Sequence, residues 1–220
     1  MNLNSTRLSN HIGIEVEGLD LRERQTPSTI ALLNKAFVDH SVLVIREQIL
    51  SPQEMVSAAQ LFGNIFEQHN NRFQLKETPL VHYISNQDRH VDGTRYIPGS
   101  GYHTDHSNDM IPPKATALHA LKLPDRGGDT QFVNMHAAYE SLSKPMKVRI
   151  HGLKARHVYQ SKFSRRQLMK LPKGHERDDS GSAMHPLVRT HPETGRKALY
   201  INPIRIDAID GMDDAEARSL

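Results

Sequence analysis

The stretch YHTD, residues 102–105, carries the strongest chemical signal in this sequence, and it follows a Gly-rich loop, PGSG, at residues 98–101. In an extended segment, residues i and i+2 point to the same side of the backbone. His103 and Asp105 would then offer a neutral nitrogen and an anionic oxygen to one metal ion. A second histidine from elsewhere would complete the two-histidine, one-carboxylate triad that binds Fe(II) and leaves coordination sites open. Taken alone the spacing is a weak signal, because a polar pair in a surface loop has the same pattern.

Further short motifs follow in order along the chain. They are PP at 112–113, LP at 123–124, GGDT at 127–130, AYE at 138–140 and the block HPLVRTHPETGR at 185–196, which continues to Leu199 and Asn202. Residues 13–21 and the segment 51–63 fit the same series. In this order and spacing the sequence closely resembles the taurine dioxygenase (TauD/TfdA) family of Fe(II)/2-oxoglutarate-dependent dioxygenases. The resemblance spans nearly the whole chain.

The resemblance implies an enzyme that uses Fe(II), 2-oxoglutarate and dioxygen to hydroxylate a small organic substrate, with release of succinate and CO2. The substrate would be anionic, of the sulfonate, sulfate or carboxylate type. His103 and Asp105 match the family's paired iron ligands. Thr130 matches the threonine that touches the 2-oxoglutarate carboxylate, although a β-branched residue also suits a strand without any such role. His69 lies near the family's substrate-contacting histidine, offset by about a residue, and an exposed loop histidine is the competing interpretation.

Composition narrows the remaining function classes. The chain of 220 residues has no cysteine, which excludes disulfides, Cys-ligated zinc and thiol nucleophiles, whereas its 14 histidines allow a metal site. The net charge of +3 is small and scattered, so we expect no nucleic-acid partner. The absence of a long apolar run predicts no membrane span and a cytoplasmic location. A small organic molecule is the expected partner, and a homo-oligomer stays open.

The pattern along the chain predicts one domain, residues 1–220, of the α+β class. Thr26-Pro27 and the capping box at 51–54 begin two helices, and residues 12–21 alternate as an edge strand would. Strands are then expected at 42–45, 80–84, 115–123 and 130–135, a helix at 137–150, and a hairpin at 185–202. Helices first and short strands afterwards favour a β-sandwich or jelly roll with helices packed outside it. The family resemblance implies that this core is a double-stranded β-helix (jelly-roll, cupin-like) with flanking helices.

The last residues depart from the family's pattern. The family's distal iron-binding histidine and its 2-oxoglutarate-binding arginine come from a C-terminal Trp-Asp-Asn-Arg…His segment, and this chain has no tryptophan. Asp213 caps a helix that stops at Leu220, so we expect a core that is incomplete at the C-terminus relative to the family. One alternative is a non-catalytic family member that acts as a binding or scaffold protein. Another is a cupin-like isomerase or hydrolase with His185 or His191 as third ligand. His119 and His157 are expected to be satisfied core or rim histidines.

Overall fold

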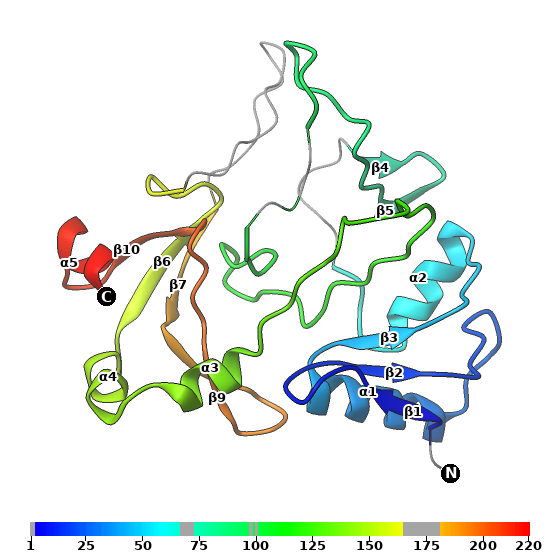
Figure 1. The fold of residues 1–220 in the computed structure, drawn as a ribbon, viewed down its shortest axis with the longest axis horizontal. Helices are drawn as coiled ribbons and strands as arrows, with labels where there is room; N and C mark the ends of the chain where they lie inside the picture. The colour runs from blue at the N-terminus through cyan, green and yellow to red at the C-terminus, as the bar shows by residue number, and fades with distance from the viewer. Residues whose placement is uncertain (1–2, 67–72, 97–98, 100, 165–180) are drawn as a thin grey trace.

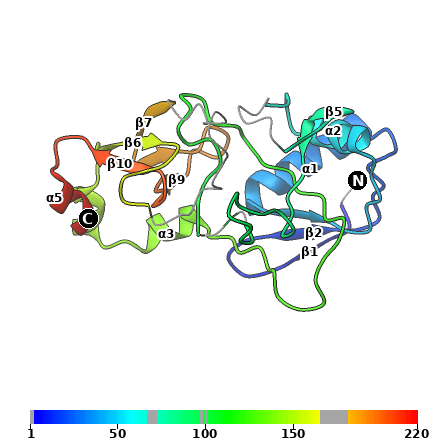
Figure 2. The same ribbon diagram turned by 90° about the horizontal axis from the view of Figure 1, so that it is seen from above.

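The computed structural model describes residues 3–66, 73–96, 99, 101–164 and 181–220. Its helices and strands gather in two groups, which long extended segments of the middle of the chain connect (Figure 1). The view from above shows the same two groups side by side, with the two ends of the chain at opposite ends of the molecule (Figure 2). The expected substrate residue His69 lies outside the described residues.

The first group is built on a three-stranded sheet of order β1-β2-β3, made by Ser5–Arg7, Ile14–Val16 and Leu43–Ile45. β1 and β2 are antiparallel, whereas β2 and β3 are parallel because α1 (Pro27–His40) crosses between them. Val16 and Leu33 are fully buried in this group. The sequence pattern predicts an edge strand within residues 12–21. In the structure this strand, β2, is central, because β1 pairs with one side of it and β3 with the other.

Both helices of the first group begin where the sequence predicts. Thr26 caps α1, and Ser51 caps α2 (Pro52–Gln60) with a complete capping box to Glu54. These side chains accept hydrogen bonds from backbone N–H groups that the first turn of a helix leaves unpaired. Beyond α2, the hairpin β4–β5 (Gln74–Leu75 and Thr78–His82) confirms the strand expected near residue 80.

The second group holds the larger apolar core. β6 (Lys154–Val158) lies between β10 (Ile206–Ile209) and β7 (Ser182–Pro186), and β8 (Val188–Thr190) forms the predicted hairpin with β9 (Lys197–Leu199). The helix expected at 137–150 is two helices, α3 (Met135–Ser141) and α4 (Lys144–Arg149), because Ser143 starts a new helix with Pro at its first turn. α5 (Asp214–Ser219) follows β10. The buried core cluster is Ile150, Ala155, Leu187, Leu199 and Ile209.

The predicted strands at 115–123 and 130–135 are wrong for this structure, since neither segment forms a strand. Their apolar positions are exposed, with Leu121 85% and Phe132 53% accessible. An alternating segment becomes a strand only where a neighbour supplies hydrogen bonds, and within the described residues no strand pairs with either segment. Within the described ranges the strands form four small sheets and no closed barrel, so the observed class is mixed α and β.

Candidate metal centre

His103 and Asp105 bring two potential metal ligands together. The imidazole Nε2 of His103 lies 3.3 Å from Oδ1 of Asp105. Two donor atoms at about 2.1 Å from an octahedral ion, on adjacent vertices, are about 3 Å apart, so the spacing suits ligation of one metal. The two residues lie where an irregular stretch enters a turn rather than in a named strand. Their side chains nevertheless converge, as the alternation of an extended segment predicts.

A hydrogen bond on the side away from the other residue orients each of the two side chains. Nδ1 of His103 lies 2.9 Å from the carbonyl oxygen of Gly101 and must donate to it, because a carbonyl only accepts. The neutral imidazole is thereby fixed with its lone pair on Nε2. Oδ2 of Asp105 accepts a hydrogen bond from the Thr116 hydroxyl at 2.8 Å. Metal-binding histidines and carboxylates characteristically have such outer partners, which set the tautomer and direction of the ligand atoms.

The electrostatics of the pair also suit a cation. The hydrogen bond to Asp105 raises the pKa of His103, against the opposing effects of burial and of the Arg205 charge. The same hydrogen bond lowers the pKa of Asp105 to about 2, although burial opposes it, and the Thr116 hydroxyl adds to the lowering. Each group therefore favours a positive charge next to the other. A metal ion bound by both atoms would compete with protonation of Nε2, which is how metal affinity and pH are ordinarily linked.

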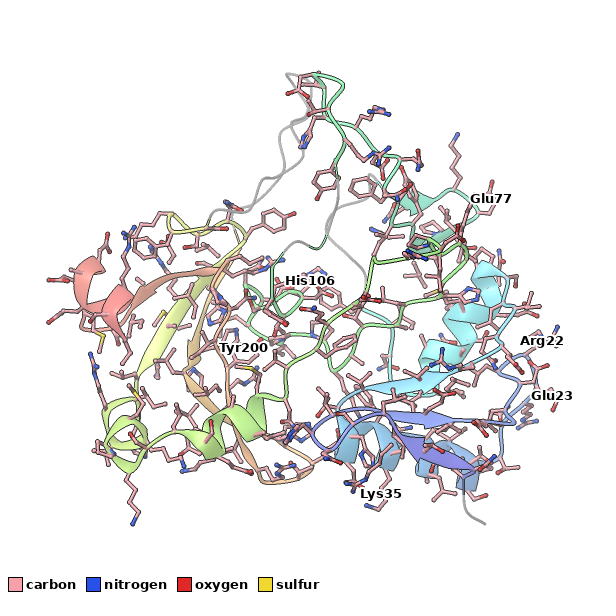
Figure 3. The ribbon with its side chains drawn as sticks, in the orientation of Figure 1. Arg22, Glu23, Lys35, Glu77, His106 and Tyr200 are labelled. Carbon is pink, nitrogen blue, oxygen red and sulfur yellow. The ribbon has the colours of Figure 1, made fainter. Side chains whose placement is uncertain are left out.

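A tight turn follows Asp105. His106 has φ of 51°, in the left-handed region, and its carbonyl accepts from the Asp109 N–H at 3.0 Å. The His106 ring packs 4.7 Å from the Phe66 ring, and Nδ1 lies 3.2 Å from Oδ2 of Asp109. Figure 3 shows His106 and Tyr200 in the middle of the molecule, whereas Arg22, Glu23 and Lys35 lie at its periphery. Sequence reasoning missed His106, although its place directly after Asp105 was a signal.

The loop after β9 reaches the same turn. The Asn202 amide donates to the Thr104 carbonyl and to the Ser107 hydroxyl, each at 3.0 Å. Nη1 of Arg205 donates to Oδ1 of Asn108 at 2.7 Å. Asn202 was part of a recognised motif, but its contact with residue 104 is not visible in the sequence because 98 residues separate the two.

Thr130 lies near the pair but does not touch it. Its side chain is exposed, lines a small surface pocket formed by residues 123–130, and makes no hydrogen bond to His103 or Asp105. A hydrogen bond between their neighbours connects the two segments: the hydroxyl of Tyr102, next to His103, donates to Oε1 of Gln131, next to Thr130, at 2.8 Å.

The other histidines do not complete a metal site in the described part of the chain, where no group of three His, Asp or Glu side chains converges. Nε2 of His185 faces the Asp109 carbonyl at 2.9 Å, and Nδ1 of His191 accepts from the Glu193 N–H at 3.2 Å. His119 is satisfied by the Gln48 carbonyl at 3.0 Å, as expected.

The expectation for His157 is wrong in one respect. It is fully buried, but neither ring nitrogen has a hydrogen-bond partner. Its ring stacks on Tyr200, with 5.3 Å between centroids, and packs edge-on against His185. Burial lowers the pKa of His157 to about 4, and the nearby charges of His185, Arg205 and Arg189 add to the lowering.

Known proteins match most or all of this chain in sequence or structure. An (S)-phenoxypropionate/alpha-ketoglutarate dioxygenase of Sphingobium herbicidovorans is 30% identical over 86% of this chain, and an alkylsulfatase of Acinetobacter baylyi 29% over 89%. The chain spans 66% and 61% of those two relatives' lengths. The crystal structure of a taurine dioxygenase from Burkholderia xenovorans has a TM-score of 0.80 at 30% identity, covering 100% of this chain and 70% of that one.

No helix in the described ranges has the length and apolar character that a membrane crossing requires. The family described as taurine catabolism dioxygenase TauD, TfdA matches residues 4–220. This chain belongs to the TauD/TfdA family.

Proposed function

We propose that this protein is an Fe(II)- and 2-oxoglutarate-dependent dioxygenase that hydroxylates a small organic anion. The observation that carries the proposal is the His103–Asp105 pair, whose Nε2 and Oδ1 lie 3.3 Å apart. Hydrogen bonds orient both side chains: Nδ1 of His103 bonds to the Gly101 carbonyl, and Oδ2 of Asp105 accepts from the Thr116 hydroxyl. Membership of the TauD/TfdA family supports the same chemistry.

In this proposal the protein's own residues bind and orient. His103, kept neutral with its proton on Nδ1, and Asp105, kept ionised, bind the metal. Thr130 contacts the carboxylate of 2-oxoglutarate, which the Tyr102–Gln131 hydrogen bond supports by holding the neighbouring residues together. His69 is a weaker candidate for the substrate. Fe(II) with 2-oxoglutarate and dioxygen would supply the oxidising power for hydroxylation, with succinate and CO2 released.

Two observations favour an anionic substrate. The relatives are named for phenoxypropionate oxidation and for alkyl sulfate cleavage, and both kinds of compound carry an oxyanion. In this chain, Arg205 adds a positive contribution to the potential at His103, smaller than the effect of Asp105, whose hydrogen bond raises the pKa of His103. This guanidinium is a candidate partner for an anionic group.

The test is iron-dependent consumption of 2-oxoglutarate by the purified protein with ascorbate present. His103→Ala and Asp105→Ala should each lower turnover at least about 100-fold, since loss of a ligand costs more than loss of an outer partner. His151→Ala, an exposed histidine away from the pair, and Asp39→Ala, an exposed aspartate on α1, are matched controls that should retain turnover. Undiminished turnover in His103→Ala would refute the metal role.

A second candidate, a non-catalytic binding protein, is favoured by the convergence of only two ligand side chains within the described residues. Two ligands hold Fe(II) more weakly than three. This candidate predicts that 2-oxoglutarate or an oxyanion binds, as measured by calorimetry, while no succinate forms under any iron concentration. Succinate production that depends on His103 would exclude it.

A further inference from the structure

We propose that Asn202 is a positioning residue whose side-chain amide, bonded to the backbone between His103 and Asp105, holds these two ligands in their converging arrangement. The proposal rests on the metal-binding role of the pair. Asn202 lies in the loop between β9 and β10, far from the pair in the sequence.

The contact falls on the short backbone segment between the two ligands. Nδ2 of Asn202 donates to the carbonyl of Thr104, which lies between His103 and Asp105, at 3.0 Å. That carbonyl belongs to the planar peptide unit that leads into Asp105. Fixing its direction therefore fixes the backbone rotation that decides whether the two side chains point to the same side. The second amide hydrogen goes to the Ser107 hydroxyl at 3.0 Å, inside the turn that follows.

Burial gives these hydrogen bonds their strength. Asn202 is 1% exposed, so water cannot take the place of the Thr104 carbonyl as the acceptor of its amide. A buried amide N–H that loses its acceptor bears the full desolvation cost. The orientation of the amide is settled by its partners, because the Thr104 carbonyl accepts only and must face Nδ2.

Asn202 is itself anchored to the second group. Its backbone carbonyl accepts from the N–H groups of Arg205 and Ile206, both at 2.9 Å, which makes a tight turn into β10. Arg205 adds a parallel link through its 2.7 Å hydrogen bond to Asn108. Its guanidinium also lies over the Tyr159 ring, 4.9 Å from the centroid. The sheet of the second group thus serves as the rigid support of a ligand pair that has no strand of its own.

Asn202→Asp tests the proposal with nearly the same shape. The carboxylate cannot donate to Thr104, whereas the Ser107 hydroxyl can turn and donate to it. Asn34→Asp is the matched control, because the Asn34 amide also donates twice, to the carbonyls of Ile30 at 3.0 Å and Leu61 at 2.8 Å, away from the ligand pair.

The measurement is titration with Co(II) alone, which binds nitrogen and oxygen sites at least as tightly as Fe(II) and whose visible absorption reports coordination geometry. We expect Asn202→Asp to weaken Co(II) binding about 10- to 100-fold and to change the absorption bands. Asn34→Asp should lower the Tm without altering either property. Asn202→Ser, which shortens the side chain and adds no charge, should also weaken Co(II) binding and replaces Asn202→Asp if that variant does not fold.

The outcomes separate the two proposals. If the wild-type protein binds Co(II) through His103 but Asn202→Asp and Asn202→Ser bind it with unchanged affinity and spectrum, the positioning role is overturned and the proposed function stands. If His103→Ala binds Co(II) as well as the wild type does, the metal role of the pair fails, and the role of Asn202 fails with it.

Discussion

At the scale of single residues, the proposed metal site is organised by the hydrogen bonds that orient its two proposed ligand side chains. The Gly101 carbonyl and the Thr116 hydroxyl take up Nδ1 of His103 and Oδ2 of Asp105, which leaves one nitrogen and one oxygen facing each other. The sequence pattern predicts that the two side chains share a side. It does not predict their outer partners, because Thr116 is eleven residues away and its approach depends on how the intervening turn closes.

His106 has a second residue-scale role, since its left-handed φ of 51° turns the chain directly after Asp105. Histidine and asparagine tolerate this conformation, whereas a β-branched side chain does not. We expect His106→Val to lose about 1–2 kcal/mol of unfolding free energy and to weaken Co(II) binding, measured by urea titration and by absorption.

His106→Asn provides the comparison, because it keeps access to the left-handed region while removing the ring that packs on Phe66. It should bind Co(II) more tightly than His106→Val does. Equal affinity in the two variants would mean that backbone conformation at this position has no influence on Asp105.

At the scale of elements, the parts predicted best are those whose signals are local. The starts of α1, α2 and α5 are set by Thr26, Ser51 and Asp213, whose side chains bond to N–H groups two or three residues on. The hairpin β8–β9 is likewise local, with Gly195 at φ of 68° in its turn. Such features need no knowledge of the rest of the fold.

The elements predicted wrongly depend on distant neighbours. Residues 115–123 alternate as a strand would, yet form none, because alternation states which face is apolar and not whether a partner strand is present. The helix expected at 137–150 divides because Ser143 caps the second helix more favourably than it continues the first. Here the local signal was present at Ser143-Lys144-Pro145, and the apolar periodicity concealed it.

The capping box of α2 allows a prediction at this scale. Ser51→Ala removes the acceptor of the Glu54 N–H and should cost about 1 kcal/mol, measured as a lower urea midpoint with an unchanged m-value. Ser57→Ala, within the same helix, is the control and should leave the midpoint unchanged or slightly raised, since alanine is the better helix former. Similar losses in both variants would show that the cap contributes nothing specific.

At the scale of the whole molecule, long-range polar contacts among the described residues join the second group to the first group and to the segment that runs between them. The Asn134 amide donates to the His11 carbonyl at 2.6 Å, Lys114 pairs with Glu193 at 2.9 Å, and Asn202 bonds to Thr104. The proposed ligand pair lies in the chain that runs between the groups. No local pattern in the sequence indicates a contact such as that of Asn202 with Thr104, so the role that we propose for Asn202 depends on the structure.

The buried histidines make the stability of the whole molecule depend on pH. Burial holds the pKa of His157 at about 4, well below the value of 6.5 that it has in the unfolded chain, and lowers the pKa of His185 as well. Below pH 6.5 the unfolded state therefore binds protons that the folded state does not accept. The stability that neutral His157 allows is fully present above pH 6.5 and is lost as the pH falls toward 4, by up to about 1.4 kcal/mol per pH unit.

His157→Phe should remove this dependence, because an apolar ring of similar size can occupy the place beside Tyr200 and leaves no nitrogen without a partner. Urea unfolding at pH 7, 6, 5 and 4.5 would measure it. The wild-type protein should lose stability steadily across this range, and the variant should lose less. His185 would account for the part that persists, so His157→Phe with His185→Phe should flatten the profile further. A variant profile parallel to that of the wild type would show that His157 takes up its proton in the folded state as readily as in the unfolded chain.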